Sequence, residues 1–299
     1  MKLEQLQHLL AIVESGSLRA ASRRLNVPQP ALTRSIRALE RELHAVLFLR
    51  ETTGMVLTPV GQRFHARASA IVNEERRARE EIAQNQGDEG GTVVAALSIM
   101  PHVGMLPRSL QTFRERWPKV KLQLMEGLFP DAESGLRDGS IDFYLGAAPR
   151  EAPAPGLQMR HLFDNTRAVV CRQGHPLARA RSLKALAGAD WAITAIDYNA
   201  EEDLSELFAG HGMPRPDIQL RASSAMSIMV ALAYTDLLAM LPVQWADFPL
   251  THDALQLVKI RERLPAPSIV LVTKAGLPQT PAAEHFCDVL LRQQPVQTP

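Results

Sequence analysis

The sequence predicts an N-terminal all-α helix-turn-helix region, a long linker helix and a C-terminal α/β region. In the first 86 residues, apolar side chains recur at spacings of three and four, as on one face of an α-helix. From Thr92 onward, short apolar runs alternate with helical stretches, which is typical of α/β domains. The length of 299 residues fits about two domains.

Charge is unevenly distributed along the chain, although the formal net charge is only +1. Residues 1–67 hold ten Lys/Arg against five Asp/Glu, whereas the remainder holds 23 against 27. This asymmetry indicates either that the first part contacts a polyanion or that it carries a solvated basic face.

Three helices are expected before residue 44. The first covers residues 3–14 and the second residues 18–25, with Ser17 as a plausible N-cap. Residues 26–28 break the chain, and a third helix follows with a buried stripe of Leu32, Ile36, Leu39 and Leu43. Two short helices joined by a short turn have the layout of a helix-turn-helix, although any three-helix bundle also exposes arginines.

The opposite face of the third helix carries side chains that suit DNA. Arg pairs with guanine and Gln with adenine in the major groove, while Thr and further Arg suit phosphates. The candidate DNA-binding residues are Gln29, Pro30, Thr33, Arg34, Arg37 and Arg50.

The exact string over residues 18–43 closely resembles the N-terminal signature of the LysR family of transcription regulators, and residues 47–50 and 57–62 continue it in register. The resemblance implies a winged helix-turn-helix domain over residues 1–58, with residues 46–57 as the wing. It also implies sequence-specific binding to double-stranded DNA at an interrupted palindrome.

Four residues depart from that family pattern. Pro28 replaces a Ser that caps the recognition helix, so Asn26 or water is left to cap it. His44 stands where the family has Gly, and Val46 where it has Pro. Thr53 replaces a wing Arg, which removes a contact to the minor groove or a phosphate and leaves the fold unaffected.

A linker helix is expected over residues 59–86, with Thr58 as N-cap and Pro59 at the first helical position. At 1.5 Å per residue it would span about 44 Å. So long a helix with a narrow apolar stripe needs a partner. The resemblance to the LysR family implies that the partner is the same helix of a second subunit. Packing of the helix onto its own domain is the alternative. The stripe consists of Val60, Phe64, Ala68, Ile71, Ala78 and Ile82. The glycine-rich residues 87–91 predict a hinge.

The remaining region, residues 92–299, predicts an α/β domain with mainly parallel sheets. Strands are expected at residues 93–97, 122–124, 141–145, 168–171, 191–195, 218–221, 237–241 and 269–273. Helices are expected at residues 104–117, 132–138, 202–210 and 226–234. No glycine lies in residues 93–101, so a dinucleotide-binding loop is not indicated.

Residues 169–178 and 268–291 also resemble LysR effector domains. This resemblance implies two subdomains like those of a periplasmic binding protein, one over residues 92–162 and 268–299 and the other over residues 163–267. A small-molecule effector would lie in the cleft between them.

Several hydroxyl and apolar side chains are candidates for that cleft because ligands bind at the carboxyl ends of strands. A few polar donors beside apolar walls suit a small organic acid, including an aromatic one. Helix caps and core packing are the alternative roles of these side chains. No Arg is clearly placed in the cleft, which predicts modest affinity. The candidate effector-binding residues are Ser98, Met100, His102, Phe129, Thr194, Ser223 and Ser224.

Catalytic, metal-binding and cofactor motifs are not found in the sequence. His175 is interpreted as a turn element. Cys171 and Cys287 are interpreted as buried structural thiols, with a redox-sensing pair as the alternative. Neither a signal peptide nor an apolar run long enough for a membrane is seen, so a cytoplasmic location is expected.

The sequence therefore predicts a ligand-responsive transcription regulator that is not an enzyme and uses no cofactor. An enzyme or solute-binding α/β protein with an accessory helical domain is the alternative. The expected partners are DNA, the effector and further copies of the chain in a dimer or tetramer, with RNA polymerase added if the protein is an activator. Whether it activates or represses is left open.

Overall fold

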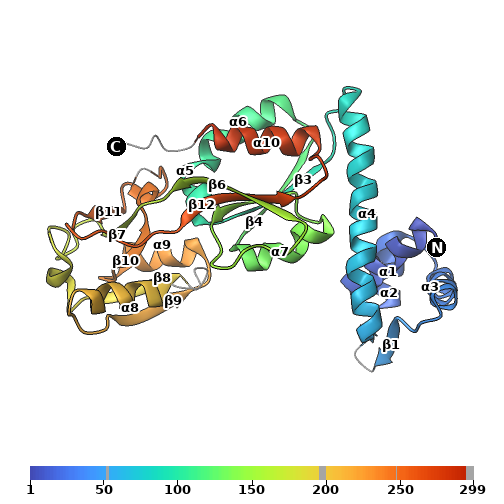
Figure 1. Cartoon of the computed structure of the whole chain (residues 1–299), viewed down its shortest axis with the longest axis horizontal. Helices are drawn as coiled ribbons and strands as arrows, with labels where there is room; N and C mark the ends of the chain where they lie inside the picture. Colours follow the sequence, from blue (N-terminus) through green and yellow to red (C-terminus); the bar gives the residue numbers. More distant parts are fainter. Residues whose placement is uncertain (52–53, 195–199, 247, 294–299) are drawn as a thin grey trace. The chain divides into compact units, whose positions relative to one another are not determined.

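A computed structural model gives the fold and describes residues 1–51, 54–194, 200–246 and 248–293. The chain divides into two compact units, Met1–Asp88 with Ser134–Ser140, and Glu89–Glu133 with Ile141–Pro299. The first unit holds the helix-turn-helix and the long helix, and the second holds the α/β domain (Figure 1).

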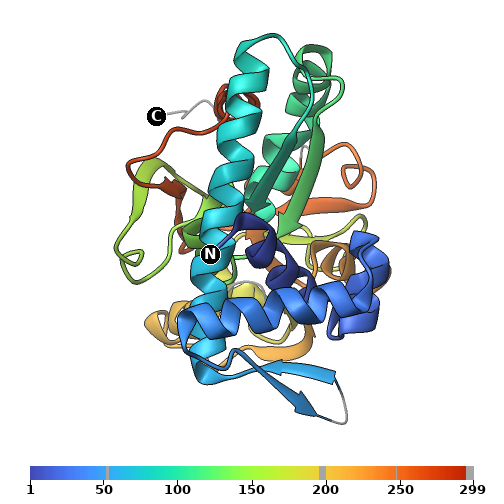
Figure 2. The same ribbon diagram turned by 90° about the vertical axis from the view of Figure 1, so that its right-hand side faces the viewer.

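The first unit packs three helices around one apolar core and adds a hairpin and a long helix. The predicted stripe of the third helix is buried, with Leu32, Ile36 and Leu39 facing the core. Thr58 caps the long helix as predicted, since its hydroxyl accepts a hydrogen bond from Gly61 N at 2.9 Å. The hairpin extends from the end of the domain where the long helix begins (Figure 2). The elements are α1 (Leu3–Ser15), α2 (Leu18–Leu25), α3 (Gln29–Leu43), β1 (Phe48–Glu51), β2 (Gly54–Leu57) and α4 (Pro59–Asn85).

The apolar side chains of α4 lie on one side of the helix, and the first unit covers only part of this stripe. Phe64 and Ala68 pack against the core of their own domain. By contrast, Val60, Ile71 and Ile82 are 45%, 44% and 61% exposed. At 3.6 residues per turn, Phe64, Ala68, Ile71 and Ile82 lie about 40°, 80°, 20° and 40° around the axis from Val60, so they share one side of the helix. Their position along the helix decides which of them the domain covers.

The second unit contains a five-stranded sheet in the order β4-β3-β5-β12-β6. Helices α6 and α10 lie side by side on one face (Figure 1), where the rings of Phe113 and Phe286 are 4.9 Å apart. On this sheet the strands are β3 (Thr92–Leu97), β4 (Lys121–Glu126), β5 (Phe143–Ala147), β6 (Leu157–Asp164) and β12 (Ser268–Lys274). Its helices are α5 (Ile99–Gly104), α6 (Leu106–Arg116) and α10 (Pro281–Leu291), and α7 (Phe129–Asp138) begins in this unit, whereas its residues from Ser134 onward belong to the first.

The rest of the second unit forms a three-stranded sheet, β10-β7-β11, and a two-stranded sheet, β8-β9. A parallel bridge between Trp191 and Leu238 joins the two. Strand β6 leads directly into β7, and a loop after β11 returns the chain to β12. The elements are β7 (Arg167–Arg172), β8 (Asp190–Thr194), α8 (Ala200–Gly210), β9 (Asp217–Ala222), α9 (Ala225–Tyr234), β10 (Ala239–Pro242) and β11 (Leu255–Val258), with short 3-10 helices at Leu183–Leu186 and Val243–Ala246.

Three expectations for the second unit need correction. The sheets are mixed rather than mainly parallel, because β12 pairs antiparallel with both β5 and β6, and β7 pairs antiparallel with both neighbours. Strands β6 and β11 were not expected from the sequence. The expected helix over 104–117 corresponds to α6, which begins at Leu106 after a separate helix, α5, that was not expected; Pro107 has no N–H and cannot continue α5.

Candidate DNA interface and effector cleft

The solvent face of α3 carries the polar side chains that the sequence assigned to DNA. Gln29, Pro30, Arg34 and Arg37 are exposed, and Thr33 is half-buried. The Thr33 hydroxyl donates to the Gln29 carbonyl oxygen at 3.0 Å, so it is tied to its own helix. The structure thus brings five of the six candidates together on one helix face.

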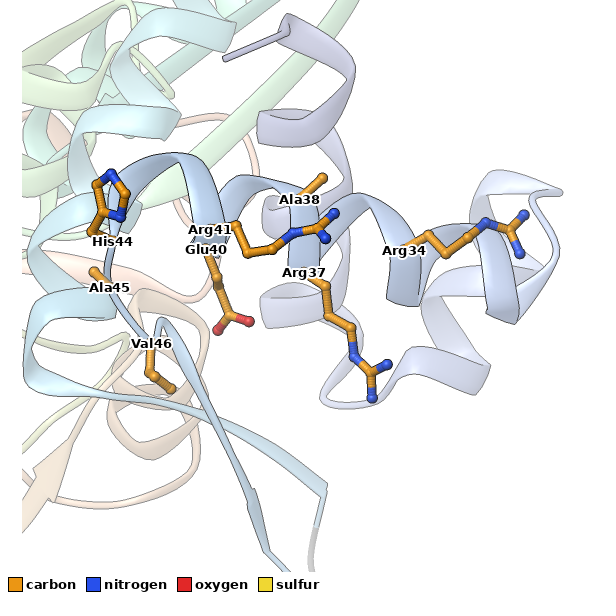
Figure 3. Close-up of a pocket in the computed structure, with 8 residues that line it drawn as sticks. All are labelled: Arg34, Arg37, Ala38, Glu40, Arg41, His44, Ala45 and Val46. Atoms are coloured by element: carbon orange, nitrogen blue, oxygen red, sulfur yellow. The ribbon is translucent and has the colours of Figure 1, made fainter.

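A continuous basic edge follows from the helical spacing of these residues. Arg34 and Arg37 are joined by Arg41 one turn further on, and Figure 3 shows the three guanidinium groups spaced along α3. His44, at the end of the helix, lies in the left-handed region with φ of 50°. Together they line an open hollow that faces solvent and suits a phosphate backbone.

The helix is held rigidly against the rest of its domain. Its buried stripe packs on α1, and His8 Nδ1 lies 2.8 Å from Ser35 Oγ on the same side. Pro28 precedes the helix and accepts from Ala31 N at 2.8 Å through its carbonyl oxygen. Asn26, expected as an alternative cap of α3, instead ends α2 in the left-handed region.

The Glu40 carboxylate connects α3 to the hairpin. Its Oε1 accepts hydrogen bonds from Leu47 N at 2.8 Å and from Phe48 N at 3.3 Å. The backbone of Arg50 pairs with Met55 in the hairpin, while the Arg50 side chain and Thr53 lie outside the described part of the structure. The orientation of the hairpin relative to α3 therefore depends on Glu40.

In the second unit, two of the predicted effector residues reach the carboxyl ends of strands. Ser98 follows β3 and Thr194 ends β8, and both line one small pocket, the inner cavity, together with Met100. Ser98 Oγ also accepts from Ala147 N at 3.3 Å, which ties the ends of β3 and β5 together. The cavity measures only about 40 Å³, so it can hold one charged head group or a water, not a whole organic acid.

Arg167 lines the same cavity, which corrects the expectation that no Arg is placed there. Its side chain is 6% exposed and pairs with Asp203, Nη1 to Oδ2, at 3.1 Å. Burial lowers the pKa of the Arg167 guanidinium, and the Asp203 carboxylate opposes that shift. Asn165, 8% exposed, adds an amide to the cavity.

Sequence reasoning missed Arg167 and Asn165 because their position depends on where the chain passes from β6 to β7. The polar triplet Asn165-Thr166-Arg167, where β6 passes into β7, was the signal that the sequence offered. Polar residues between strands are usually turn residues, so the triplet alone could not indicate a site.

A wider pocket adjoins the cavity and shares Leu128, Ala147 and Pro267 with it. This outer pocket measures about 620 Å³, enough for the body of a small organic molecule. Phe129 lines it rather than the inner cavity and packs edge-on against Tyr144, with the ring centroids 5.7 Å apart. Phe129 and Met100, which were expected on one apolar wall, thus line two adjoining pockets.

Three other candidates lie away from the inner cavity and the outer pocket. His102 lines a separate apolar groove and keeps its Nδ1 3.1 Å from the Ser98 carbonyl oxygen. Ser224 caps α9, since its hydroxyl accepts from Ser227 N at 3.2 Å, and Ser223 is exposed. Glu126 Oε1 accepts from Ala225 N at 2.9 Å, so a carboxylate of the protein already occupies the start of α9.

The remaining chemically active side chains have structural surroundings. His175 accepts from Leu177 N at 2.9 Å through Nδ1 and places Nε2 3.0 Å from the Asp236 carbonyl oxygen, which confirms its place in a turn. Both cysteines are free and buried, and burial raises the pKa of Cys171 to about 11 and that of Cys287 to about 12. Among the described residues, no group of three His, Cys, Asp or Glu side chains is placed to hold a metal ion. Within the same residues, no helix combines the length and apolarity needed to cross a membrane.

Comparison with known families assigns both units. Residues 3–62 match the bacterial regulatory helix-turn-helix protein, lysR family, and residues 86–295 match the LysR substrate binding domain. The chain belongs to the LysR family. It is a LysR-type transcriptional regulator with a helix-turn-helix DNA-binding domain and an effector-binding domain.

Relatives in the LysR family match over nearly the whole chain. The SDS degradation transcriptional activation protein of Pseudomonas sp. (strain ATCC 19151) is 27% identical over 296 residues, covering 97% of this chain and 95% of the relative. The HTH-type transcriptional regulator TdcA of Escherichia coli (strain K12) is 23% identical over 266 residues, covering 88% and 85%.

Solved full-length LysR structures share the fold. CbnR, a LysR family transcriptional regulator, aligns with a TM-score of 0.70 at 22% identity, covering 98% of this chain and 99% of CbnR. Full-length OxyR from Pseudomonas aeruginosa, solved as a point variant, aligns with a TM-score of 0.72 at 20% identity, covering 100% and 99%. Full-length CbnR complexed with its target DNA aligns with a TM-score of 0.69 at 22% identity, covering 98% and 100%.

Proposed function

We propose that this LysR-type regulator reads an interrupted palindrome with α3 and that a small organic anion bound near Arg167 controls it. The basic edge of α3 carries the first part of the proposal. Arg34, near the start of the helix, suits a guanine edge in the major groove, and Arg37 suits a phosphate. The likeness to a regulator solved with its target DNA supports this assignment.

The two roles are separated by measuring the affinity for the DNA upstream of the protein's own gene at several salt concentrations. Arg34→Ala should reduce the free energy of binding to the best DNA site by about 1–3 kcal/mol and make the protein less selective for the base that Arg34 contacts. Arg37→Ala should weaken binding to all DNA sequences alike. It should also reduce the slope of log affinity against log salt concentration by about one. Arg108→Ala, which removes an exposed charge from the other unit, is the control. Unchanged affinity of Arg34→Ala for the best site would refute the assignment of α3.

The buried guanidinium of Arg167 carries the second part of the proposal. It lies among Ser98, Asn165 and Thr194, which offer hydroxyl and amide groups to a carboxylate or sulfonate head. The outer pocket has room for the apolar body of such a molecule. One relative is named for degradation of SDS, an alkyl sulfate, so sulfonates belong among the probes.

Thermal shift and calorimetry with acetate, benzoate and benzenesulfonate test the anion site, with benzamide as the neutral counterpart of benzoate. We expect at least one anion to raise the melting temperature while benzamide does not. Arg167→Met should abolish that shift, and Ser98→Ala and Thr194→Val should reduce it. Binding of benzamide as tight as benzoate, or an unchanged shift in Arg167→Met, would contradict an anionic effector.

We also propose that α4 pairs between subunits in a dimer or tetramer. Val60, Ile71 and Ile82 form an exposed apolar line along one side of the helix. Ile71→Asp with Ile82→Asp should lower the mass measured by light scattering, because charge would be buried in the seam. Phe64 is unsuitable for this test because it packs into its own domain. An unchanged mass would contradict pairing through this line.

A further inference from the structure

A chain of three charged side chains lies beside the effector cavity. Asp203 on α8 contacts two arginines, with Oδ2 3.1 Å from Arg167 Nη1 and Oδ1 3.7 Å from Arg150 Nη2. Arg150 follows β5, so it comes from the five-stranded sheet, and its Nη1 also pairs with Glu202 Oε2 at 3.2 Å. Asp203 is thus shared between a buried and an exposed arginine.

The two arginines differ in how much they depend on Asp203. Arg167 is 6% exposed, and a buried guanidinium needs a counter-charge because burial removes its hydration. Arg150 is 59% exposed and remains hydrated without a partner. In the free protein, Asp203 accordingly lies closer to Arg167, at 3.1 Å, than to Arg150, at 3.7 Å.

An anionic effector bound at Arg167 would meet the Asp203 carboxylate. Two negative charges on one buried guanidinium repel each other strongly in a medium of low dielectric constant. This repulsion favours the departure of one anion, and Asp203 has a second arginine within 3.7 Å. Both Arg150 and Asp203 line the outer pocket, so this movement would take place at the mouth of the site.

We infer that the anionic group of the effector replaces the Asp203 carboxylate on Arg167, and that the displaced Asp203 then pairs with Arg150 alone, more closely than at 3.7 Å. The inference rests on the proposed anion site and makes Asp203 a built-in competitor that sets the affinity of that site. Transfer of Asp203 strengthens an ion pair between α8 and the loop after β5. Occupancy of the inner cavity thereby tightens the existing contact between Asp203 and Arg150 in the outer pocket.

The direction in which one substitution changes the affinity for the anion tests the exchange. Asp203→Asn removes the competing charge, so calorimetry should show binding about tenfold tighter than wild type. The probe is whichever of benzoate and benzenesulfonate gives the larger thermal shift on wild type. If Asp203 instead holds Arg167 in place, binding by Asp203→Asn becomes weaker. Weaker or unchanged binding overturns the exchange.

A matched variant separates the local exchange from an effect of net charge. Glu206 is exposed one turn further along α8, and Glu206→Gln removes the same charge. Its affinity should equal that of wild type, because long-range effects of exposed charges are screened by salt. An equal gain in both variants would show that net charge alone is responsible and would overturn the exchange.

A second variant keeps the inference testable if Asp203→Asn does not fold. Arg150→Gln alters an exposed side chain and takes away the second partner of Asp203, so binding should weaken about two- to threefold. Unchanged or tighter binding overturns the transfer to Arg150. If wild type binds neither probe, or if Arg167→Met binds as wild type does, the anion site itself is wrong and the exchange fails with it. Loss of binding in Arg167→Met without a gain in Asp203→Asn refutes only the exchange.

Discussion

Replacing Glu40 with Ala should destabilise the DNA-binding unit more than any other loss of a single exposed or half-buried carboxylate there. Glu40 Oε1 receives two backbone N–H groups, those of Leu47 and Phe48, both of which are buried residues. In Glu40→Ala these donors lose a charged acceptor at the junction of α3 and β1.

The expected loss follows from these two hydrogen bonds. A hydrogen bond to a charged group contributes about 1.5–3 kcal/mol, and the longer bond at 3.3 Å contributes less. Because Glu40 is only half-buried, water can bond part of the time to the two N–H groups in Glu40→Ala. The net loss in the free energy of unfolding is therefore about 2 kcal/mol. For a domain of this size, that corresponds to a fall in melting temperature of about 8–16 °C.

Calorimetry of the full chain measures this change, and specific DNA identifies the transition of the DNA-binding unit because a ligand stabilises the folded form to which it binds. Glu40→Gln keeps an acceptor oxygen and should lose about half as much. Glu42→Ala is the control, since Glu42 pairs at the surface with the N-terminal amine and such pairs contribute little. Equal melting temperatures of Glu40→Ala and Glu42→Ala would refute the reasoning.

Three further changes have predicted directions. Gly61→Ala should destabilise the same unit by about 1–3 kcal/mol, measured by thermal unfolding, because the added Cβ would lie 2.2 Å from the Leu47 carbonyl oxygen. His44→Gly should stabilise it by about 0.5–1 kcal/mol, because only glycine adopts a φ of 50° without strain. Cys171 and Cys287 should resist alkylation at pH 8, because their raised pKa values keep both thiols protonated. Mass spectrometry measures the extent of labelling. The stability that the neutral thiols contribute should be complete below about pH 9, the ordinary value, and should fall as the pH rises toward 11.

A specific result would contradict each of these three predictions. Gln62→Ala, an exposed change in the same turn of α4, controls for helix propensity, and a Gly61→Ala protein as stable as this control would rule out the clash. A lower melting temperature for His44→Gly would mean that the imidazole makes a stabilising contact that outweighs backbone strain. Rapid stoichiometric labelling of either cysteine in the folded protein would contradict its burial.

The helices of the DNA-binding unit could be predicted because their periodicity is local. Leu32, Ile36 and Leu39 share one face of any α-helix, and the bulk of that face must be buried somewhere. The same argument placed Gln29, Arg34 and Arg37 together on the opposite face. The N-cap at Thr58 was likewise predictable from a few adjacent residues.

The direction in which an apolar side chain packs depends on its partner, which the sequence does not contain. Phe64 and Ile71 belong to one apolar pattern on α4, yet one faces its own domain and the other faces solvent. In the α/β domain, Ser98 and Thr194 were predicted at the cleft because strands end there, and both line the cavity.

The pairing of Arg167 with Asp203 was decided only by the tertiary structure. The two residues are 36 positions apart, and their meeting depends on the antiparallel pairing of β12 with β6, on the passage of the chain into β7 and on the position of α8. Periodicity reports which face of one element is buried. It does not report which elements meet, and the charge environment of the effector cavity is set by that meeting.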